Sequence, residues 1–142
     1  MKFFAIAASA FLIGVTAASA DPIEDRQALM KERGAQMQVL VPMAQEKQPF
    51  DAAAAMAALE TLAANAASVD VEALWPEGSM GGENDTAPAA WENWDDFVAA
   101  HDKFKADAEA AVAANPQDLD TFKGVFGSVA ANCGSCHQTF RL

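Results

Sequence analysis

The order of apolar and polar positions predicts four amphipathic helices in the part of the chain that follows residue 20. In these segments apolar side chains recur at intervals of three and four residues, which places them on one face of an α-helix. The most regular series lies near the end of the chain and consists of Leu119, Phe122, Phe126, Val129, Cys133, Cys136 and Phe140. Both cysteines therefore belong to the face of the last helix that we expect to pack against the core.

Capping and turn residues set the limits of the first two helices. Asp21 and Pro22 are a capping residue and a first-turn proline, so the first helix starts there, and Pro42 should kink or end it. Asp51 is in position to cap a second, alanine-rich helix over residues 52–67. The small side chains of this helix permit close packing against a neighbour.

The second half of the chain contains a long turn-rich segment followed by two further helices. Residues 68–90 carry several glycines and prolines and form a longer connection than most compact domains contain. A third helix is expected over residues 88–115, where Asn115 and Pro116 end it, and Asp118 can cap the fourth. Four helices and no strand pattern predict an all-α fold, an antiparallel four-helix bundle.

Residues 1–20 have the features of a secretory signal peptide. Lys2 supplies a positive charge, an apolar run follows over residues 3–15, and small residues at 18 and 20 resemble a cleavage site. The alternative is an uncleaved anchor, but the run is shorter than the ~20 residues that a membrane span needs. We therefore expect cleavage, export to the periplasm, a single domain over residues 21–142 and no membrane span after cleavage.

Composition and charge exclude one class of partner. The 142-residue chain contains nine Lys and Arg against twenty Asp and Glu, which gives a formal net charge of −11. An acidic chain without a basic cluster repels polyanions, so nucleic acid is not an expected partner. The same acidic surface could steer a basic redox partner protein toward this one.

The two cysteines lie in the pentapeptide Cys133-Gly134-Ser135-Cys136-His137, the C-x-x-C-H signature of c-type haem attachment. Two thiols on adjacent helical turns can form thioethers with the two vinyl groups of one porphyrin. The next residue then offers an imidazole to the iron, and imidazole is a common axial ligand of haem. The motif predicts one covalently attached haem c, with Cys133 and Cys136 as anchors and His137 as proximal ligand.

Three other interpretations account less well for this motif. A redox-active disulfide would be expected in a βαβ context, whereas this motif lies late on a helix. A zinc site would need a further ligand such as His101 to join Cys133, Cys136 and His137. A helical interaction module without haem would carry no covalent cofactor at all. Because only five residues follow His137, any sixth iron ligand must come from an upstream helix.

The mature chain resembles the class II c-type cytochromes, that is, the cytochrome c prime family and its low-spin relatives. Five segments carry the resemblance: residues 26–31 (Arg-Gln-Ala-Leu-Met-Lys), 49–51 (Pro-Phe-Asp), 74–79 (Leu-Trp-Pro-Glu-Gly-Ser), Trp91, and 133–141, which run from the haem motif to a trailing Phe-Arg. The resemblance implies a left-handed four-helix bundle with the haem between its helices. It also implies homodimers, which members of the family often form through their first two helices.

The resemblance further assigns roles to individual residues. It implies that Arg26 and Gln27 lie near the haem propionates and that Arg141 lies near the proximal face. Met30 would lie over the distal face. Asp85, in the loop, is expected to approach the haem, although the loop varies in length across the family.

Met30 separates two functions that the resemblance allows. In low-spin relatives a methionine in a similar Leu-Met-Lys context ligates the iron, and the protein carries single electrons. In five-coordinate members an apolar side chain blocks the iron, which then binds nitric oxide or carbon monoxide as a small gas ligand. A methionine on an apolar face also packs simply as core. The thioether is an available iron donor, which favours electron transfer.

The remaining aromatic and ionisable residues suggest no enzyme. His101 lies on the inner face of the third helix, where it could be a second ligand or a proton relay. A single histidine at such a position is more often hydrogen-bonded or partly exposed, and we expect that state. Trp91 and Trp94 are assigned to packing. Because no second cluster of acid-base groups accompanies the haem motif, catalysis is not expected.

Overall fold

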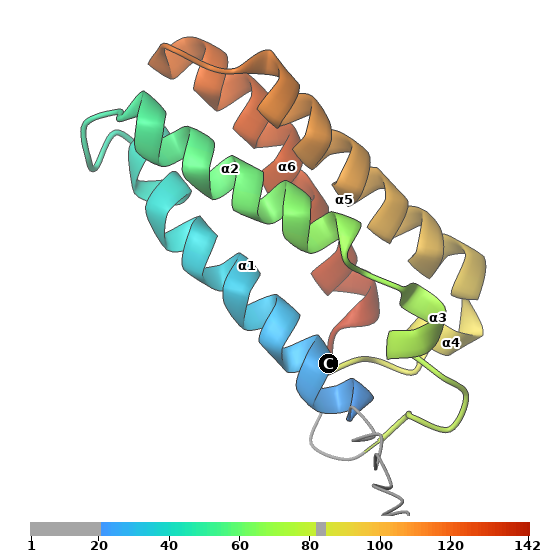
Figure 1. The fold of residues 1–142 in the computed structure, drawn as a ribbon. Helices are drawn as coiled ribbons and strands as arrows, with labels where there is room; N and C mark the ends of the chain where they lie inside the picture. Colours follow the sequence, from blue (N-terminus) through green and yellow to red (C-terminus); the bar gives the residue numbers. More distant parts are fainter. Residues whose placement is uncertain (1–20, 82–84) are drawn as a thin grey trace, which may run out of the picture.

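The computed structural model of the protein describes residues 21–81 and 85–142, so the predicted signal peptide at residues 1–20 lies outside the described residues. Four long helices run side by side, and two short helices lie near one end of the bundle (Figure 1). The predicted all-α four-helix bundle is confirmed. Among the described residues, no helix combines the length and apolar content that a membrane span requires.

The first two long helices begin at the residues that the sequence indicates. α1 spans Pro22–Ala44 and α2 spans Ala52–Ala67. The carboxylates of Asp21 and Asp51 each accept a hydrogen bond from a first-turn backbone N–H, at 2.9 and 3.0 Å. α1 continues through Pro42, which lies within its last turn. A proline there removes only one helical hydrogen bond, so the helix ends shortly after it rather than before it.

The connection between α2 and the third long helix contains two short helices. α3, which spans Val71–Leu74, lies in the segment predicted to be turns, and α4, which spans Ala89–Glu92, is a separate helix at the start of the predicted third helix. The third long helix, α5, spans Trp94–Ala114. The prediction of one continuous helix over residues 88–115 is therefore wrong.

The interruption lies at Asn93, whose backbone is not helical, with φ −121° and ψ 56°. Its side-chain amide donates to the carbonyl of Ala89 at 3.4 Å. Asparagine side chains compete in this way for backbone partners and therefore favour helix ends. The other end of α5 follows the prediction: Asn115 adopts the left-handed conformation, at φ 44°, and stops the helix.

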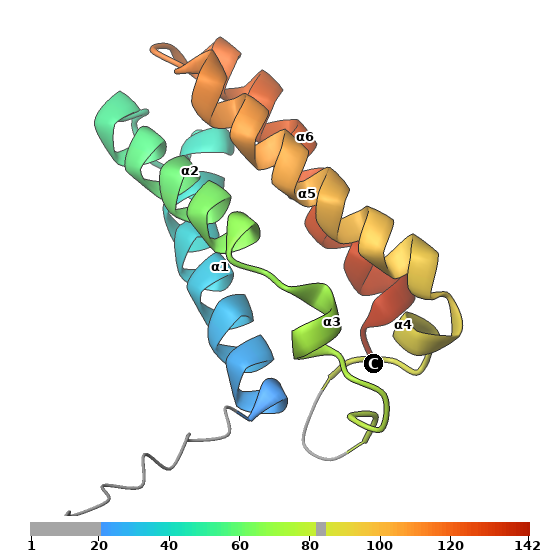
Figure 2. The ribbon, with the colours of Figure 1, turned by 45° about the vertical axis from the view of Figure 1, so that its right-hand side comes forward.

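The last helix, α6, spans Leu119–Phe140 and is capped by Asp118 as predicted, with a 2.8 Å bond from the backbone N–H of Thr121. Immediately after α6, Arg141 forms an isolated antiparallel bridge with Thr86. This bridge ties the long connection to the end of the last helix, and the C-terminus lies at the end of the bundle that carries α3 and α4 (Figure 2).

The buried apolar side chains form two clusters at different heights of the bundle. The larger cluster joins α1, α2, α5 and α6 through Leu40, Met43, Ala55, Ala58, Leu59, Leu62, Ala66, Phe104, Ala111, Phe122, Phe126 and Val129. The smaller cluster lies near the short helices and consists of Trp75, Ala90, Phe97 and Phe140. The first half of α1 diverges from α5 and α6 toward the end that carries the smaller cluster (Figure 2).

We predict that the larger cluster supplies most of the stability of the bundle. Leu62 is fully buried in it, so Leu62→Ala should lower the free energy of unfolding by about 2–5 kcal/mol, through lost burial and the cavity left behind. Glu60→Ala, at an exposed position of the same helix, should change it by less than about 0.5 kcal/mol. Urea titrations would test both variants, and equal effects would contradict this assignment.

Candidate cofactor site

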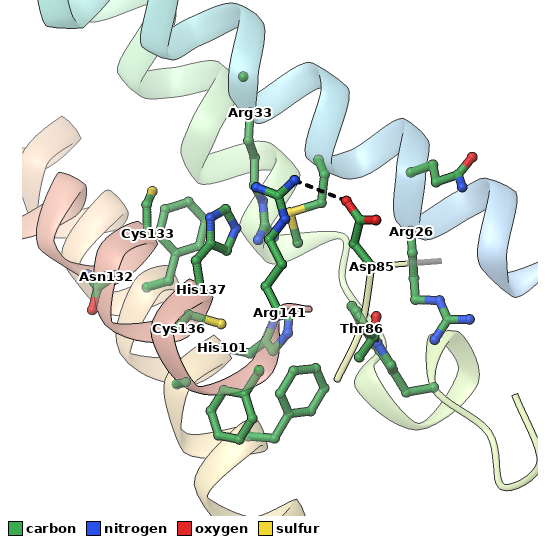
Figure 3. A pocket seen from close by; sticks show the side chains of 18 of the residues that line it. Arg26, Arg33, Asp85, Thr86, His101, Asn132, Cys133, Cys136, His137 and Arg141 are labelled. Carbon is green, nitrogen blue, oxygen red and sulfur yellow. Dashed lines mark hydrogen bonds and ion pairs between the residues drawn. The ribbon is translucent and has the colours of Figure 1, made fainter. Parts of the chain in front are cut away.

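A cavity of about 580 Å³ opens where α1 diverges from α5 and α6. Its walls come from these three helices, from Trp75 and the segment at Asp85 and Thr86, and from Arg141 after α6 (Figure 3). No described residue of α2 lines it. Phe104 of the larger apolar cluster and Phe97 of the smaller one both line the cavity, which therefore lies between the two clusters. This volume lies in the range of roughly 300–1,000 Å³ that ligand pockets occupy.

The haem-attachment motif forms one wall of this cavity. Cys133 and Cys136 are half-buried and His137 is exposed at the edge, all three on the last turns of α6. The two cysteines are not joined in a disulfide. Burial raises the pKa of both thiols, and the guanidinium of Arg33 offsets part of that rise. Burial lowers the pKa of His137, with further contributions from Arg141 and Arg33, which favours the neutral imidazole that a metal requires.

The opposite wall comes from α1, which contributes Arg26, Gln27 and Met30 from the block that resembles the class II cytochromes. Residues 26 and 30 are one helical turn apart and therefore share a face. Met30 is half-buried. The structure thus brings Met30 and the motif of α6 to the same cavity from two different helices, although 103 positions separate Met30 from Cys133 in the sequence.

Arg26 is a buried residue with one unpartnered nitrogen. Its Nε donates to the carbonyl of Pro22 at 3.1 Å and its Nη2 to the carbonyl of Ser79 at 3.3 Å. The guanidinium lies over the rings of Trp75 and Trp91, at 5.5 and 5.9 Å from their centroids. Among the described residues, the buried Nη1 has no partner. A buried cation with a free donor fits an anionic group inside the cavity.

Asp85 and Arg141 meet at the cavity edge, where Arg141 donates to the Asp85 carboxylate at 3.0 Å (Figure 3). The backbone N–H of Leu142 donates to the carbonyl of Asp85 at 2.8 Å, next to the bridge at Thr86. Both side chains of the ion pair are exposed, and such pairs contribute little stability. The pairing therefore serves mainly to position the segment beside the cavity.

Sequence reasoning did not identify Arg33, which also lines the cavity. Its Nε donates to Oδ1 of Asn65 at 2.6 Å, and its guanidinium lies 4.5 Å from the ring centroid of Phe104. The available signal was the spacing, because Arg33 follows Met30 by three positions and shares its helix face. Asn65, the partner from α2, offered no comparable signal.

The expectation that His101 is hydrogen-bonded or partly exposed is wrong. Its side chain is only 8% exposed and lies in the cavity wall. Its ring is tilted against that of Trp75 and meets that of Phe97 edge to face, with ring centroids 5.0 and 4.8 Å away. Among the described residues, its buried Nε2 has no hydrogen-bond partner. Burial, and then the charge of Arg33, lower the pKa of His101 to about 4, so the imidazole is neutral at neutral pH.

Trp91 and Trp94 pack as predicted. Both contact the smaller apolar cluster. The indole N–H of Trp91 donates to the carbonyl of Trp75 at 3.2 Å, and the ring of Trp94 lies 5.9 Å from that of Phe97. Because Trp75 and Phe97 line the cavity, these contacts support its wall.

The residues present fit a covalently held haem. Two thiols on one helix face stand beside an imidazole, and a largely apolar cavity opens in front of them, with buried unpartnered nitrogens on Arg26 and His101. A porphyrin needs an apolar enclosure, an iron donor and partners for its propionates, and each is available here. Zinc fits less well, because no three His, Cys, Asp or Glu of the described residues gather as metal ligands.

Comparisons with known proteins support the same interpretation. The family model described as Cytochrome C′ matches residues 21–141. A cytochrome c-556 of Agrobacterium fabrum is 40% identical over 124 residues, which cover 87% of this chain and 83% of the relative. The chain belongs to the cytochrome c′ family.

Solved structures of cytochromes c′ have the same fold. That from Rhodopseudomonas palustris has a TM-score of 0.79 and 30% identity, covering 87% of this chain and 98% of the other. A second, described as a cytochrome c′ with ligand-controlled dimer dissociation, has a TM-score of 0.75 and 27% identity, with the same coverage of 87% and 98%. This member of the cytochrome c′ family is accordingly a monohaem protein whose cofactor is covalently bound haem c.

We predict that His101 makes this cytochrome less stable in mild acid. The pKa of His101 is about 4 in the folded protein and near 6.5 in the unfolded chain. Between pH 6.5 and pH 4 the unfolded chain therefore binds a proton at this histidine that the folded protein does not bind, and the folded state loses stability. Lowering the pH from about 7 to about 5 should therefore cost about 2 kcal/mol through this residue.

The matched variant is His101→Phe, which keeps an aromatic ring in contact with Trp75 and Phe97 but cannot titrate. Urea titrations of the haem-loaded proteins at both pH values would give the comparison. The variant should lose less stability on acidification than the unmodified protein. Equal losses would show that His101 does not carry the effect.

Proposed function

We propose that this protein is a periplasmic carrier of single electrons and not an enzyme. The observation that carries the proposal is the position of Met30, which lines the cavity from α1 while the haem motif lines it from α6. A thioether and an imidazole on facing helices provide two axial donors for one iron. An iron with both axial positions filled exchanges electrons without a vacant site for a substrate.

In this proposal each residue of the motif has one task. Cys133 and Cys136 would hold the haem through thioether bonds to its two vinyl groups. His137 would supply the proximal nitrogen, and its lowered pKa favours the neutral imidazole. When bound, the haem supplies the reversible one-electron couple that the chain itself lacks.

The charged groups around the cavity would position the haem. Arg26, with its unpartnered Nη1, and the neighbouring Gln27 are proposed to face the propionates. Arg141 and Asp85 are proposed to lie against the haem surroundings at the cavity edge, where their ion pair joins the long connection to α6. These assignments follow the family resemblance, and the placement of all four residues in the cavity wall supports them.

The second candidate function is gas binding at a five-coordinate iron, either as storage or as protection against nitric oxide. Two observations favour it. The structurally similar proteins are named cytochromes c′, and Met30 is half-buried in the cavity wall, so its side chain could pack over the iron without binding it. The two functions differ in the sixth coordination position alone and can be separated spectroscopically.

We predict that Met30→Ala converts the ferric protein from low spin to high spin. The unmodified protein should show a sulfur-to-iron band at the red end of its absorption spectrum and low-spin paramagnetic resonance signals. The variant should lose both and bind carbon monoxide when reduced. Met37→Ala is the matched control, because Met37 lines the same cavity from the same helix.

Two outcomes would contradict ligation by Met30. A low-spin spectrum that survives Met30→Ala, or one that disappears with Met37→Ala instead, would assign the sixth ligand elsewhere. If the unmodified protein is already high spin and binds nitric oxide, the gas-binding function replaces electron transfer.

The proposal extends to the compartment in which haem is attached and to the proteins that this chain binds. Haem c is proposed to be attached in the periplasm after removal of residues 1–20. The formal charge of −11 favours a basic redox protein as partner, since opposite charges speed encounter. A homodimer through α1 and α2 is a further proposal, supported by the similar cytochrome c′ whose description includes a dimer.

We predict that the mature protein begins at Asp21 and carries one haem. Intact-mass spectrometry after expression in a host that attaches haem c should give the mass of residues 21–142 plus a single haem. Cys133→Ala combined with Cys136→Ala should remove the haem mass and leave the same starting residue. A mature chain that retains residues 1–20, or that carries no haem, would contradict export or haem attachment respectively.

A further inference from the structure

Arg33 places a positive charge in the haem cavity at a position that neither the haem motif nor the family resemblance assigns. It lines the cavity wall on the same face of α1 as Met30. Its guanidinium lowers the pKa of His101 and of His137 and offsets the rise in the pKa of both cysteine thiols. Arg33 and these four groups line one cavity, which accounts for its effect on all of them.

The side chain is held in place by two fixed contacts. Asn65 of α2 is 4% exposed, and its Oδ1 accepts the 2.6 Å hydrogen bond from Nε of Arg33. The amide nitrogen of Asn65 donates to the carbonyl of Leu29 and to the carboxylate of Glu32, so its orientation is determined. On the other side, the guanidinium lies over the ring of Phe104.

Among the described residues, no carboxylate forms an ion pair with Arg33, and Asp85 in the cavity wall is paired with Arg141. The charge of Glu32, an exposed residue whose carboxylate is bound to Asn65, offsets only part of that of Arg33. The two cysteines carry no balancing charge, because burial raises the pKa of their thiols and a thioether is equally uncharged. His101 is neutral. A guanidinium keeps its proton in proteins, so the charge persists at working pH.

Arg33 also lies apart from the arginine proposed for the propionates. Seven residues separate Arg26 from Arg33, which corresponds to about 10 Å along α1. Vinyl and propionate groups occupy opposite halves of a haem. Arg33 lines the cavity together with Cys133 and Cys136, which would bind the vinyl half. Arg33 would therefore lie nearer than Arg26 to the half that carries no charged substituent.

We propose that Arg33, held by Asn65, is a fixed positive charge that favours the reduced haem and so raises the reduction potential of this cytochrome. Reduction by a one-electron donor adds one negative charge to the cavity, and no covalent bond forms or breaks. The attraction between that charge and a nearby cation is strong because the walls have a low dielectric constant. Charge and burial around a haem are among the properties that set its potential.

The test is a potentiometric titration of the haem-loaded protein with redox mediators. Arg33→Gln should shift the midpoint potential to more negative values. Lys47→Gln removes the same charge from an exposed position in the turn between α1 and α2, and should leave the midpoint potential unchanged. Arg33→Lys keeps the positive charge but loses the planar guanidinium that binds Asn65. It should therefore shift the midpoint potential less than Arg33→Gln does.

A second variant tests the charge without changing Arg33. Asn65→Asp combined with Glu32→Gln exchanges the amide and the carboxylate, so a hydrogen bond between residues 32 and 65 is kept while a carboxylate stands beside the guanidinium, and the potential should also fall. Far-ultraviolet circular dichroism and haem content would establish that each variant folds and is loaded. The absorption bands that report the axial ligands should be unchanged in both variants.

The proposal is overturned if Arg33→Gln leaves the potential unchanged or raises it. It is also overturned if the potential falls only in variants whose axial-ligand bands change, because the effect would then pass through the iron ligands. The inference rests on haem in this cavity and not on Met30 as ligand. A high-spin protein with the predicted shift would reject ligation by Met30 and still support the role of Arg33.

Discussion

The structure depends on a four-helix bundle whose core is filled with apolar side chains in one half and contains a cavity in the other. A bundle core normally fills with side chains along its whole length. Here the larger apolar cluster closes the half that contains the turn between α1 and α2, and the smaller cluster around Trp75 closes the opposite end. The cavity between them has the donors that a haem needs, and the haem then supplies the apolar contacts that the core lacks at that height.

The helix that carries the haem motif joins both clusters, which explains its apolar pattern. Its first half contributes Phe122, Phe126 and Val129 to the larger cluster, and its last residue, Phe140, packs in the smaller one. The cysteines lie on the stretch between these anchors. The same face of α6 thus changes from core packing to cofactor attachment and back, which is why its three- and four-residue spacing continues without interruption through the motif.

Much of this arrangement could be predicted because it depends on local sequence. Capping carboxylates at Asp21, Asp51 and Asp118 define helix starts, and the pentapeptide of α6 defines the cofactor. The break at Asn93 was missed because its side chain competes with a strong helical pattern, and the outcome depends on tertiary packing. The environments of His101 and Arg33 depend on contacts between helices that are distant in sequence, such as the bond from Arg33 to Asn65, and a single sequence does not reveal these.

The bond between Asn65 and Arg33 gives α2 an influence on a cavity that none of its described residues lines. Substitutions in this helix can redirect a charge that faces the haem while every residue in the cavity wall stays the same. Two members of the family with identical cavity walls can therefore differ in redox chemistry. For protein engineering, position 65 offers a way to adjust the cofactor from outside its binding site, without the loss of haem that changes in the wall itself risk.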